Sequence, residues 1–133
     1  MLPPVHPTIE SLRGFGTFTR VISHGKKFEQ KPLKAFMLSS VAQKTELCIG
    51  FAVTRGIRKA VHRNLVKRLM REAFRSNREE YTALVDSGMR TEIVFLYNGG
   101  IILPSKKNRR ESINQAFAGL SSTMKSVCPG VTI

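Results

Sequence analysis

The chain has 133 residues and a formal net charge of +13, from 22 lysines and arginines against 9 aspartates and glutamates. Hydrophobic residues make up 41% of it, which excludes disorder throughout and suits a single domain over residues 1–133. Such an excess of positive charge repels itself unless a polyanion neutralises it. Nucleic acid is the usual polyanion, and an anionic membrane surface is the alternative.

The first half of the chain predicts a lead-in, a helix and two strands. Residues 1–8 contain three prolines and are expected to be irregular. The stretch "TFTRVISHG" (17–25) predicts a short helix that places Phe18, Val21 and Ile22 on one face and ends at a glycine. Strands are expected at "LKAFMLSS" (33–40) and at the nearly continuous apolar run "ELCIGFAVT" (46–54), with "VAQKT" as a hairpin loop between them.

The second half predicts a long basic helix over about 58–80, a strand at "TEIVFLYN" (91–98) and a helix over 105–127 with Ser105 as its cap. The order is therefore helix, two strands, helix, strand, helix. This order predicts the α+β class, as a small two-layer α/β sandwich with one sheet and helices packed on a face of it.

The basic helix divides into two sides when its residues are placed at about 100° intervals. Val66, Leu69, Met70 and Ala73 gather on one side, which we expect to pack against the sheet. Asn64 and the cations gather on the other side. These cations are Arg63, Lys67, Arg68, Arg71, Arg75 and Arg78.

Four of these cations form an uninterrupted row with a spacing of four residues: Arg63, Lys67, Arg71 and Arg75. Like charges at this spacing repel one another in an isolated helix. An ordinary solvated face would intersperse acids, but here only Glu72 intervenes. The row favours phosphate binding, because guanidinium groups match phosphate oxygens bidentately. Asn64 adds a side chain that can contact a base edge or a 2′-hydroxyl.

The segment "AVHRNLVKRLMREAFR" (60–75) resembles the signature of the protein subunit of bacterial ribonuclease P, roughly A-V-x-R-N-R-x-K-R-x-x-R-E. The helix at 17–25 and the strand at 49–54 also resemble the family, and the resemblance covers about residues 12–120. Eight positions of the signature agree at fixed spacing: Ala60, Val61, Arg63, Asn64, Lys67, Arg68, Arg71 and Glu72.

Three positions depart from the family pattern. Leu65 replaces the second arginine of the Arg-Asn-Arg core, Gly56 replaces a lysine, and Cys48 replaces an arginine common at the start of the second strand. Leu65 lies at the edge of the apolar side, so its replacement weakens the margin of the basic stripe and leaves its centre intact. Charge is kept at Arg55 and gained at Arg58.

The resemblance implies a non-catalytic partner of a large catalytic RNA. The complex would hydrolyse precursor tRNA to free the mature 5′ end, so the implied partners are the catalytic RNA and the precursor tRNA, with no DNA and no membrane. Mg²⁺ is expected for the holoenzyme, and none is evident in the protein itself. The implied fold is like the second domain of ribosomal protein S5, with a left-handed βαβ crossover against the general right-handed preference.

The resemblance also implies two sets of site residues. The first set binds the catalytic RNA: Arg55, Arg58, Arg63, Asn64, Lys67, Arg68, Arg71 and Arg75. The second set lines a cleft for the precursor's 5′ leader between the first helix and the sheet: Phe18, Ile22, Lys26, Lys27, Lys34 and Phe36. Flat rings with surrounding positive charge suit a single-stranded nucleic acid. On periodicity alone, the two phenylalanines would be interpreted as core residues.

Intrinsic catalysis is disfavoured, because the predicted strands carry no paired-acid motif that could hold metal ions, and His6, His24 and His62 are scattered along the chain. A structural, ribosomal-type RNA-binding protein would explain the charge and fold but not the signature. A DNA-binding regulator would show a helix-turn-helix pair. Membrane-surface binding needs a free apolar helix face, whereas this one is expected to pack on the sheet.

Cys48 and Cys128 stand in no metal-binding or redox pair, which indicates a reducing compartment. The chain shows no signal peptide and no apolar run near the roughly 20 residues of a membrane span, so we expect a cytoplasmic protein. A second basic cluster lies at the start of the last helix and either contacts RNA or adds solubility. It consists of Lys106, Lys107, Arg109 and Arg110.

Overall fold

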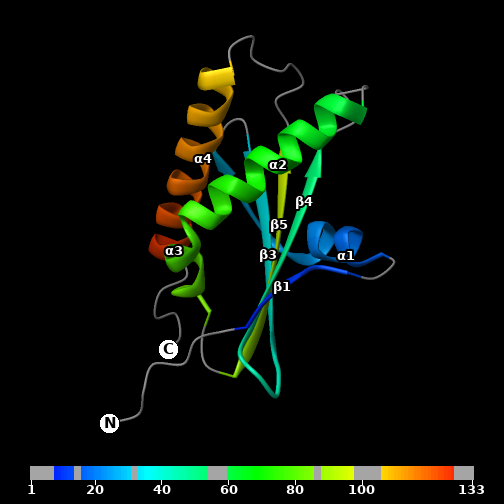
Figure 1. Cartoon of the computed structure of the whole chain (residues 1–133). Helices are drawn as coiled ribbons and strands as arrows, with labels where there is room; N and C mark the ends of the chain where they lie inside the picture. Colours follow the sequence, from blue (N-terminus) through cyan, green and yellow to red (C-terminus); the bar gives the residue numbers. More distant parts are fainter. Residues whose placement is uncertain are drawn as a thin grey trace.

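The computed structural model describes residues 8–13, 16–30, 33–53, 60–85, 88–97 and 106–127. One five-stranded sheet carries helices on both faces, with α2 and α4 on one side and α1 on the other (Figure 1). This architecture confirms the predicted α+β class, and it differs from the predicted two layers in that α1 covers the second face of the sheet. The elements in chain order are β1 (Thr8–Ser11), α1 (Thr17–His24), β2 (Lys26–Gln30), β3 (Leu33–Val41), β4 (Glu46–Val53), α2 (Ala60–Ser76), α3 (Arg78–Thr82), β5 (Met89–Tyr97) and α4 (Lys106–Val127).

The strands lie in the order β1-β4-β5-β3-β2, so the hairpin predicted between β3 and β4 is wrong. β5 lies between them, parallel to β4 and antiparallel to β3. Most of its side chains are buried, which suits the central position in the sheet. The loop that follows β3 is tied to the start of β5 by two hydrogen bonds, from the Ala42 amide to the Gly88 carbonyl (2.9 Å) and from the Gly88 amide to Thr45 Oγ1 (2.9 Å).

Two further strands were not predicted. β1 pairs in parallel with β4, and β2 pairs antiparallel with β3, so each forms an edge of the sheet. The irregular lead-in expected for residues 1–8 is therefore wrong at Thr8, which is the first residue of β1. Within the described ranges, no helix combines the length and the apolar character that crossing a bilayer requires.

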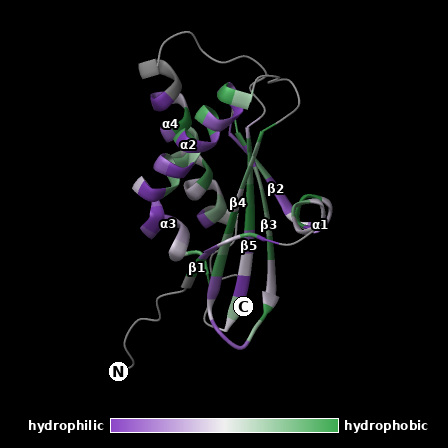
Figure 2. Cartoon of the chain, turned by 45° about the vertical axis from the view of Figure 1, so that its right-hand side comes forward, coloured by the Kyte–Doolittle hydropathy of each residue, from purple (hydrophilic) through white to green (hydrophobic). Residues whose placement is uncertain are grey.

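The main core lies between the sheet and the layer formed by α2, α3 and α4. All four residues predicted for the apolar side of α2 are buried in it. Aromatic rings pack against one another there: Phe95 on β5 and Phe117 on α4, for example, have centroids 4.5 Å apart. Figure 2 shows hydrophobic strands between the helices, while α2 and α4 are largely hydrophilic on their outer sides. The predicted helical spacing of α4 is confirmed by the buried residues Ile113, Phe117, Leu120 and Met124.

A second, smaller core lies on the opposite face of the sheet, beneath α1. Val21 of α1 is fully buried there against Phe36, Cys48 and Val94. α1 ends as predicted at Gly25, whose amide donates a hydrogen bond to the Val21 carbonyl at 2.7 Å. Among the described elements, one short helix covers this face, whereas three helices cover the other.

The helix predicted over about 58–80 is two helices in the structure. α2 ends at Ser76, and α3 begins at Arg78 after a break at Asn77. The Asn77 side-chain amide donates to the Ala73 carbonyl at 2.8 Å, which satisfies a group at the end of α2. The parallel β4 and β5 with α2 between them form a βαβ unit. Its left-handed sense stays a prediction.

Candidate nucleic-acid interface

The outward side of α2 is a stripe of cations and amides on a helix whose other side is committed to the core. Arg63, Asn64, Arg68, Arg71 and Arg75 are exposed, and Lys67 is half-buried. The amphipathic division predicted from the sequence is therefore confirmed. Two other residues predicted to bind the catalytic RNA, Arg55 and Arg58, lie outside the described residues.

Most of this stripe is electrostatically unneutralised. Glu72 lies 4.0 Å from Arg68 Nε and accepts a hydrogen bond from Arg110 Nη1 at 2.9 Å. In the part of the chain that the structure describes, the row Arg63, Lys67, Arg71 and Arg75 forms no ion pair. The single nearby acid thus neutralises the margin of the stripe. Its centre is left with free positive charge that a polyanion can neutralise.

Arg110 is the one member of the second basic cluster whose side chain is described. Its contact with Glu72 joins the first turns of α4 to the C-terminal part of α2. Arg110 therefore links α4 to α2. The ion pair itself adds little to the free energy of folding, because both side chains are exposed to solvent.

A groove of about 480 Å³ runs beside the first half of α2 and reaches across the edge of the sheet. Its walls come from three elements: Phe18 from α1, Phe51 and Val53 from β4, and the polar side of α2. The groove can connect both faces because β1 pairs with β4 only as far as Ile49, so no described strand pairs with residues 50–53 of β4 on that side. The α2 stripe reaches this groove, because three of its residues line it: Arg63, Asn64 and Lys67.

Phe51 was missed as a candidate site residue. It is half-buried, lines the groove, and lies with its ring centroid 6.0 Å from Arg71 Cζ. This cation–π contact holds one guanidinium group of the stripe against the sheet. The sequence carried a usable signal, because alternation along β4 places Phe51 on the same face as Leu47 and Ile49, the face that α2 covers.

The structure divides the residues predicted for the leader cleft. Phe18 and Ile22 are half-buried on the inner side of α1, and the Phe18 ring lies directly over Gly50. Phe36 is only 9% exposed and belongs to the second core. The packing interpretation therefore describes Phe36 better than an open stacking platform does, and Phe18 is the cleft aromatic with an accessible ring.

The three lysines predicted for the cleft do not share one face. Lys27 is the register partner of Phe36, and Lys34 lies two residues before Phe36 on β3, so both belong to the α1 face. Lys26 alternates to the other face, where its ammonium lies 5.9 Å from the centroid of the Phe28 ring. Lys26 is thus the member of the predicted set that the structure places away from the others.

A buried charge network beneath α1 was also missed. Glu92 on β5 is 2% exposed and accepts a hydrogen bond from Arg20 Nη2 at 2.6 Å. Arg90 lies 3.7 Å from the same carboxylate and donates to Glu46 at 2.9 Å. Burial raises the pKa of the neighbouring Cys48 thiol, and Arg90 opposes this only partly. Within the described ranges, no group of three or more His, Cys, Asp or Glu residues could hold a metal ion.

The family model for Ribonuclease P matches residues 7–121. The chain belongs to the Ribonuclease P family. The match includes the α1 face, the groove at the edge of β4 and the whole of α2, so the stripe lies within the family region. The match also confirms the family that the signature in residues 60–75 indicated.

Relatives in the Ribonuclease P family are similar to parts of this chain. The ribonuclease P protein component of Clostridioides difficile is 34% identical over 71 residues, which are 53% of this chain and 60% of that protein. That of Desulfotalea psychrophila is 38% identical over 80 residues, which are 60% of this chain and 58% of that protein. The alignments therefore span somewhat more than half the length of these relatives.

Solved structures of the Ribonuclease P family share the fold. The RNase P protein of Staphylococcus aureus superimposes with a TM-score of 0.63 at 16% identity, over 86% of this chain and 94% of that one. A mutant of the S. aureus protein with defective mRNA degradation activity gives a TM-score of 0.65 at 16% identity, over 86% of this chain and 87% of that one. At this identity the comparison establishes the fold alone.

Proposed function

We propose that this chain is the protein component of ribonuclease P and acts with a catalytic RNA in the 5′ maturation of precursor tRNA. In this proposal the polar side of α2 binds the catalytic RNA. The groove and the α1 face bind the single-stranded 5′ leader of the precursor. The protein works where both RNAs are found, in the cytoplasm.

One observation supports the RNA-binding role most strongly. Four cations stand in a row on α2 without an acidic partner among the described side chains, on a helix whose opposite side is buried. The fold therefore holds mutually repelling charges in place through packing energy. Binding of phosphates releases that repulsion together with the counterions of the RNA, so affinity should depend steeply on salt.

The leader-binding role is supported by the position of the groove. It is lined by two half-buried rings, Phe18 and Phe51, and by polar and cationic groups of α2. Stacking on a flat ring combined with backbone phosphate contacts suits a single strand of any sequence. The groove also joins the α1 face to the α2 stripe, so one protein could contact the leader and the catalytic RNA together.

The protein's own residues bind and orient in this proposal, and the RNA supplies the catalytic groups. Mg²⁺ is expected to act in the assembled enzyme. The described side chains of this chain provide no ligand cluster for such an ion. We therefore derive no metal-dependent step from them.

The test is a cleavage assay with the purified protein, a bacterial ribonuclease P RNA and a 5′-extended precursor tRNA at low Mg²⁺. Release of the leader is followed with protein alone, RNA alone and both together. We expect the RNA to be required and the protein to stimulate it strongly. Cleavage by the protein alone would contradict the assignment of catalysis to the RNA.

Two variants make the assay specific. Arg63→Ala removes one unpaired cation from the stripe, and Lys44→Ala removes one exposed cation from the loop before β4, at the other end of that strand from α2. Arg63→Ala should weaken the stimulation and Lys44→Ala should leave it unchanged. Tight RNA binding without stimulation by the wild-type protein would favour a structural RNA-binding protein.

A further inference from the structure

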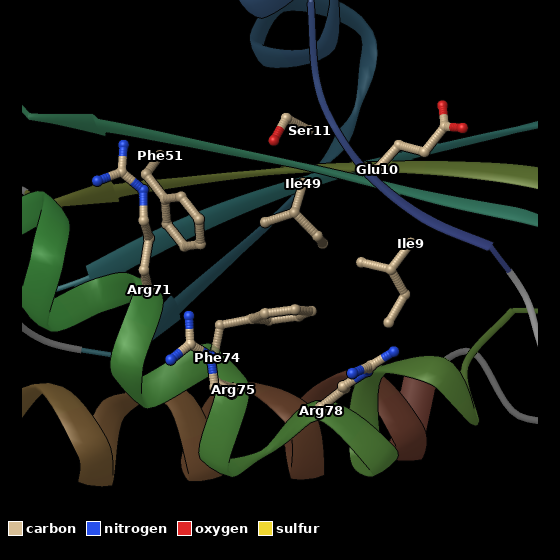
Figure 3. Close-up of a pocket in the computed structure, with 9 residues that line it drawn as sticks. All are labelled: Ile9, Glu10, Ser11, Ile49, Phe51, Arg71, Phe74, Arg75 and Arg78. Carbon is tan, nitrogen blue, oxygen red and sulfur yellow. The ribbon is translucent and has the colours of Figure 1, made fainter.

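A second groove of about 310 Å³ lies beside the other half of α2, where β1 and β4 face the junction of α2 and α3 (Figure 3). Its floor is apolar and partly aromatic. Ile9 comes from β1, Ile49 and Phe51 come from β4, and Phe74 comes from α2. Its volume is near the lower end of the roughly 300–1,000 Å³ typical of small-ligand pockets. The groove can therefore hold one small flat group.

Three arginines line the rim of this groove: Arg71, Arg75 and Arg78. None of them forms an ion pair with any described acid. Glu10 borders the groove, but its carboxylate points away from the cavity in Figure 3. The register explains this direction, because Glu10 pairs with Cys48, whose side chain belongs to the α1 face. The electrostatic field inside the groove is therefore positive.

Local structure places two of these cations. Arg71 lies over the Phe51 ring at 6.0 Å from its centroid. Arg78 follows the break at Asn77 and is brought to the β1 side of the groove beside Ile9 (Figure 3). A continuous helix would have carried Arg78 onward along the polar side of α2. The break instead directs this cation into the pocket.

We propose that this groove holds one unpaired nucleobase of a bound RNA, with the three guanidinium groups contacting the phosphates on either side. The proposal rests on the proposed function, and it means that the protein recognises an unpaired base in a bulge or at an end of the RNA. Aromatic and apolar floors bind base faces, and arginine matches both phosphate oxygens and ring faces. Arg71 and Arg75 belong to the α2 stripe as well, so an RNA on the stripe already passes the groove.

The test observes isoleucine methyl groups by NMR in the full chain, labelled with ¹³C at the δ1 positions. The probes are hexa-adenylate and a six-residue abasic ribose-phosphate chain. A seated base shifts the methyl resonances of Ile9 and Ile49 through its ring current. Ile22 on α1 reports binding on the α1 face, and the fully packed Ile113 on α4 is the internal control. We expect Ile9 and Ile49 to move with hexa-adenylate and much less with the abasic chain.

Two variants separate the floor from the cations. Ile9→Ser should weaken hexa-adenylate binding about 3- to 10-fold without changing its salt dependence, which corresponds to a loss of part of one stacking contact. Val41→Ser is the matched control, because Val41 is a strand residue that is 87% exposed and far from the groove in the sheet. Arg78→Ala should weaken the binding of both probes and make that binding less dependent on salt concentration.

The outcomes distinguish this proposal from the proposed function. If hexa-adenylate moves Ile22 alone, the groove holds no base, although binding to the ribonuclease P RNA can still depend on Arg63. If hexaglutamate moves Ile9 and Ile49 as strongly as hexa-adenylate does, the groove is a site for acidic peptides and our proposal is wrong. If the wild-type protein fails to bind the ribonuclease P RNA at all, the proposed function itself is contradicted.

Discussion

At the scale of single residues, the face beneath α1 depends on one buried carboxylate. Glu92 is 2% exposed and lies between Arg20 of α1 and Arg90 of its own strand. A buried charge is tolerated when it is paired and hydrogen-bonded, and removing its partner groups is costly. Glu92 therefore fixes α1 on the sheet, and with it the position of the Phe18 ring.

Neutralising this carboxylate should destabilise the protein. Glu92→Gln is expected to lower the free energy of unfolding by about 1.5–3 kcal/mol, the range for a hydrogen bond to a charged group. Glu46→Gln is the control. Glu46 is more exposed, so this substitution should lower the free energy of unfolding by less than about 1 kcal/mol. Urea denaturation measures both variants. Equal losses would show that Glu92 has no special role.

Two glycines provide a second test at this scale. A Cβ on Gly50 would lie 2.5 Å from Phe18 Cζ, whereas a Cβ on Gly25 would lie 2.5 Å from the Val21 carbonyl oxygen. A phenyl ring can turn away, but a helix carbonyl cannot. Gly50→Ala should therefore lower the free energy of unfolding by less than about 1.5 kcal/mol, and its main effect should be weaker binding of a single-stranded leader. Gly25→Ala should cost more stability, as measured by urea denaturation. The reverse order would contradict the described seating of Phe18.

At the scale of elements, the break between α2 and α3 directs the chain into the core. Tyr81 of α3 is fully buried, and its hydroxyl donates a hydrogen bond to the Phe117 carbonyl of α4. Burial raises the pKa of this hydroxyl above its ordinary value of 10.0. The folded protein therefore keeps the proton on Tyr81 at pH values where the unfolded chain loses it.

Tyr81→Phe tests this contact through its pH dependence. Near neutral pH the variant should lose about 0.5–1.5 kcal/mol of unfolding free energy with the hydrogen bond. Above pH 10 only the wild-type unfolded state gains stability by ionising this tyrosine. The difference between the two proteins should then shrink by about 1.4 kcal/mol per pH unit. A constant difference from pH 8 to pH 11 in denaturation experiments would contradict the burial of the hydroxyl.

The elements that the sequence predicted well are those with long periodic patterns. The apolar side of α2 and the spacing in α4 follow the helical repeat over many residues, and both are confirmed. β1 ("TIES") and β2 ("KKFEQ") were missed because each is short and mostly polar, so local pattern gives little signal. The hairpin was mispredicted because β3 pairs with β2 and with β5, and β5 lies about fifty residues further along the chain.

At the scale of the whole molecule, the fold separates stability from binding. The sheet buries apolar side chains on both faces, while positive charge gathers along α2 and around the two grooves beside it. The sequence predicted the stripe because its spacing is local. It could not predict the grooves, because they depend on where β1 stops along β4 and on the helix break at Asn77.

The central claim is that the α2 stripe binds RNA phosphates, and salt dependence tests it most directly. The affinity of the wild-type protein for the ribonuclease P RNA is measured over a range of salt concentrations, alongside Arg71→Ala and Lys44→Ala. We predict that log K falls linearly with log salt, and that Arg71→Ala makes the slope shallower by about one unit while Lys44→Ala leaves it unchanged. An unchanged slope for Arg71→Ala would place this residue outside the interface and contradict the account.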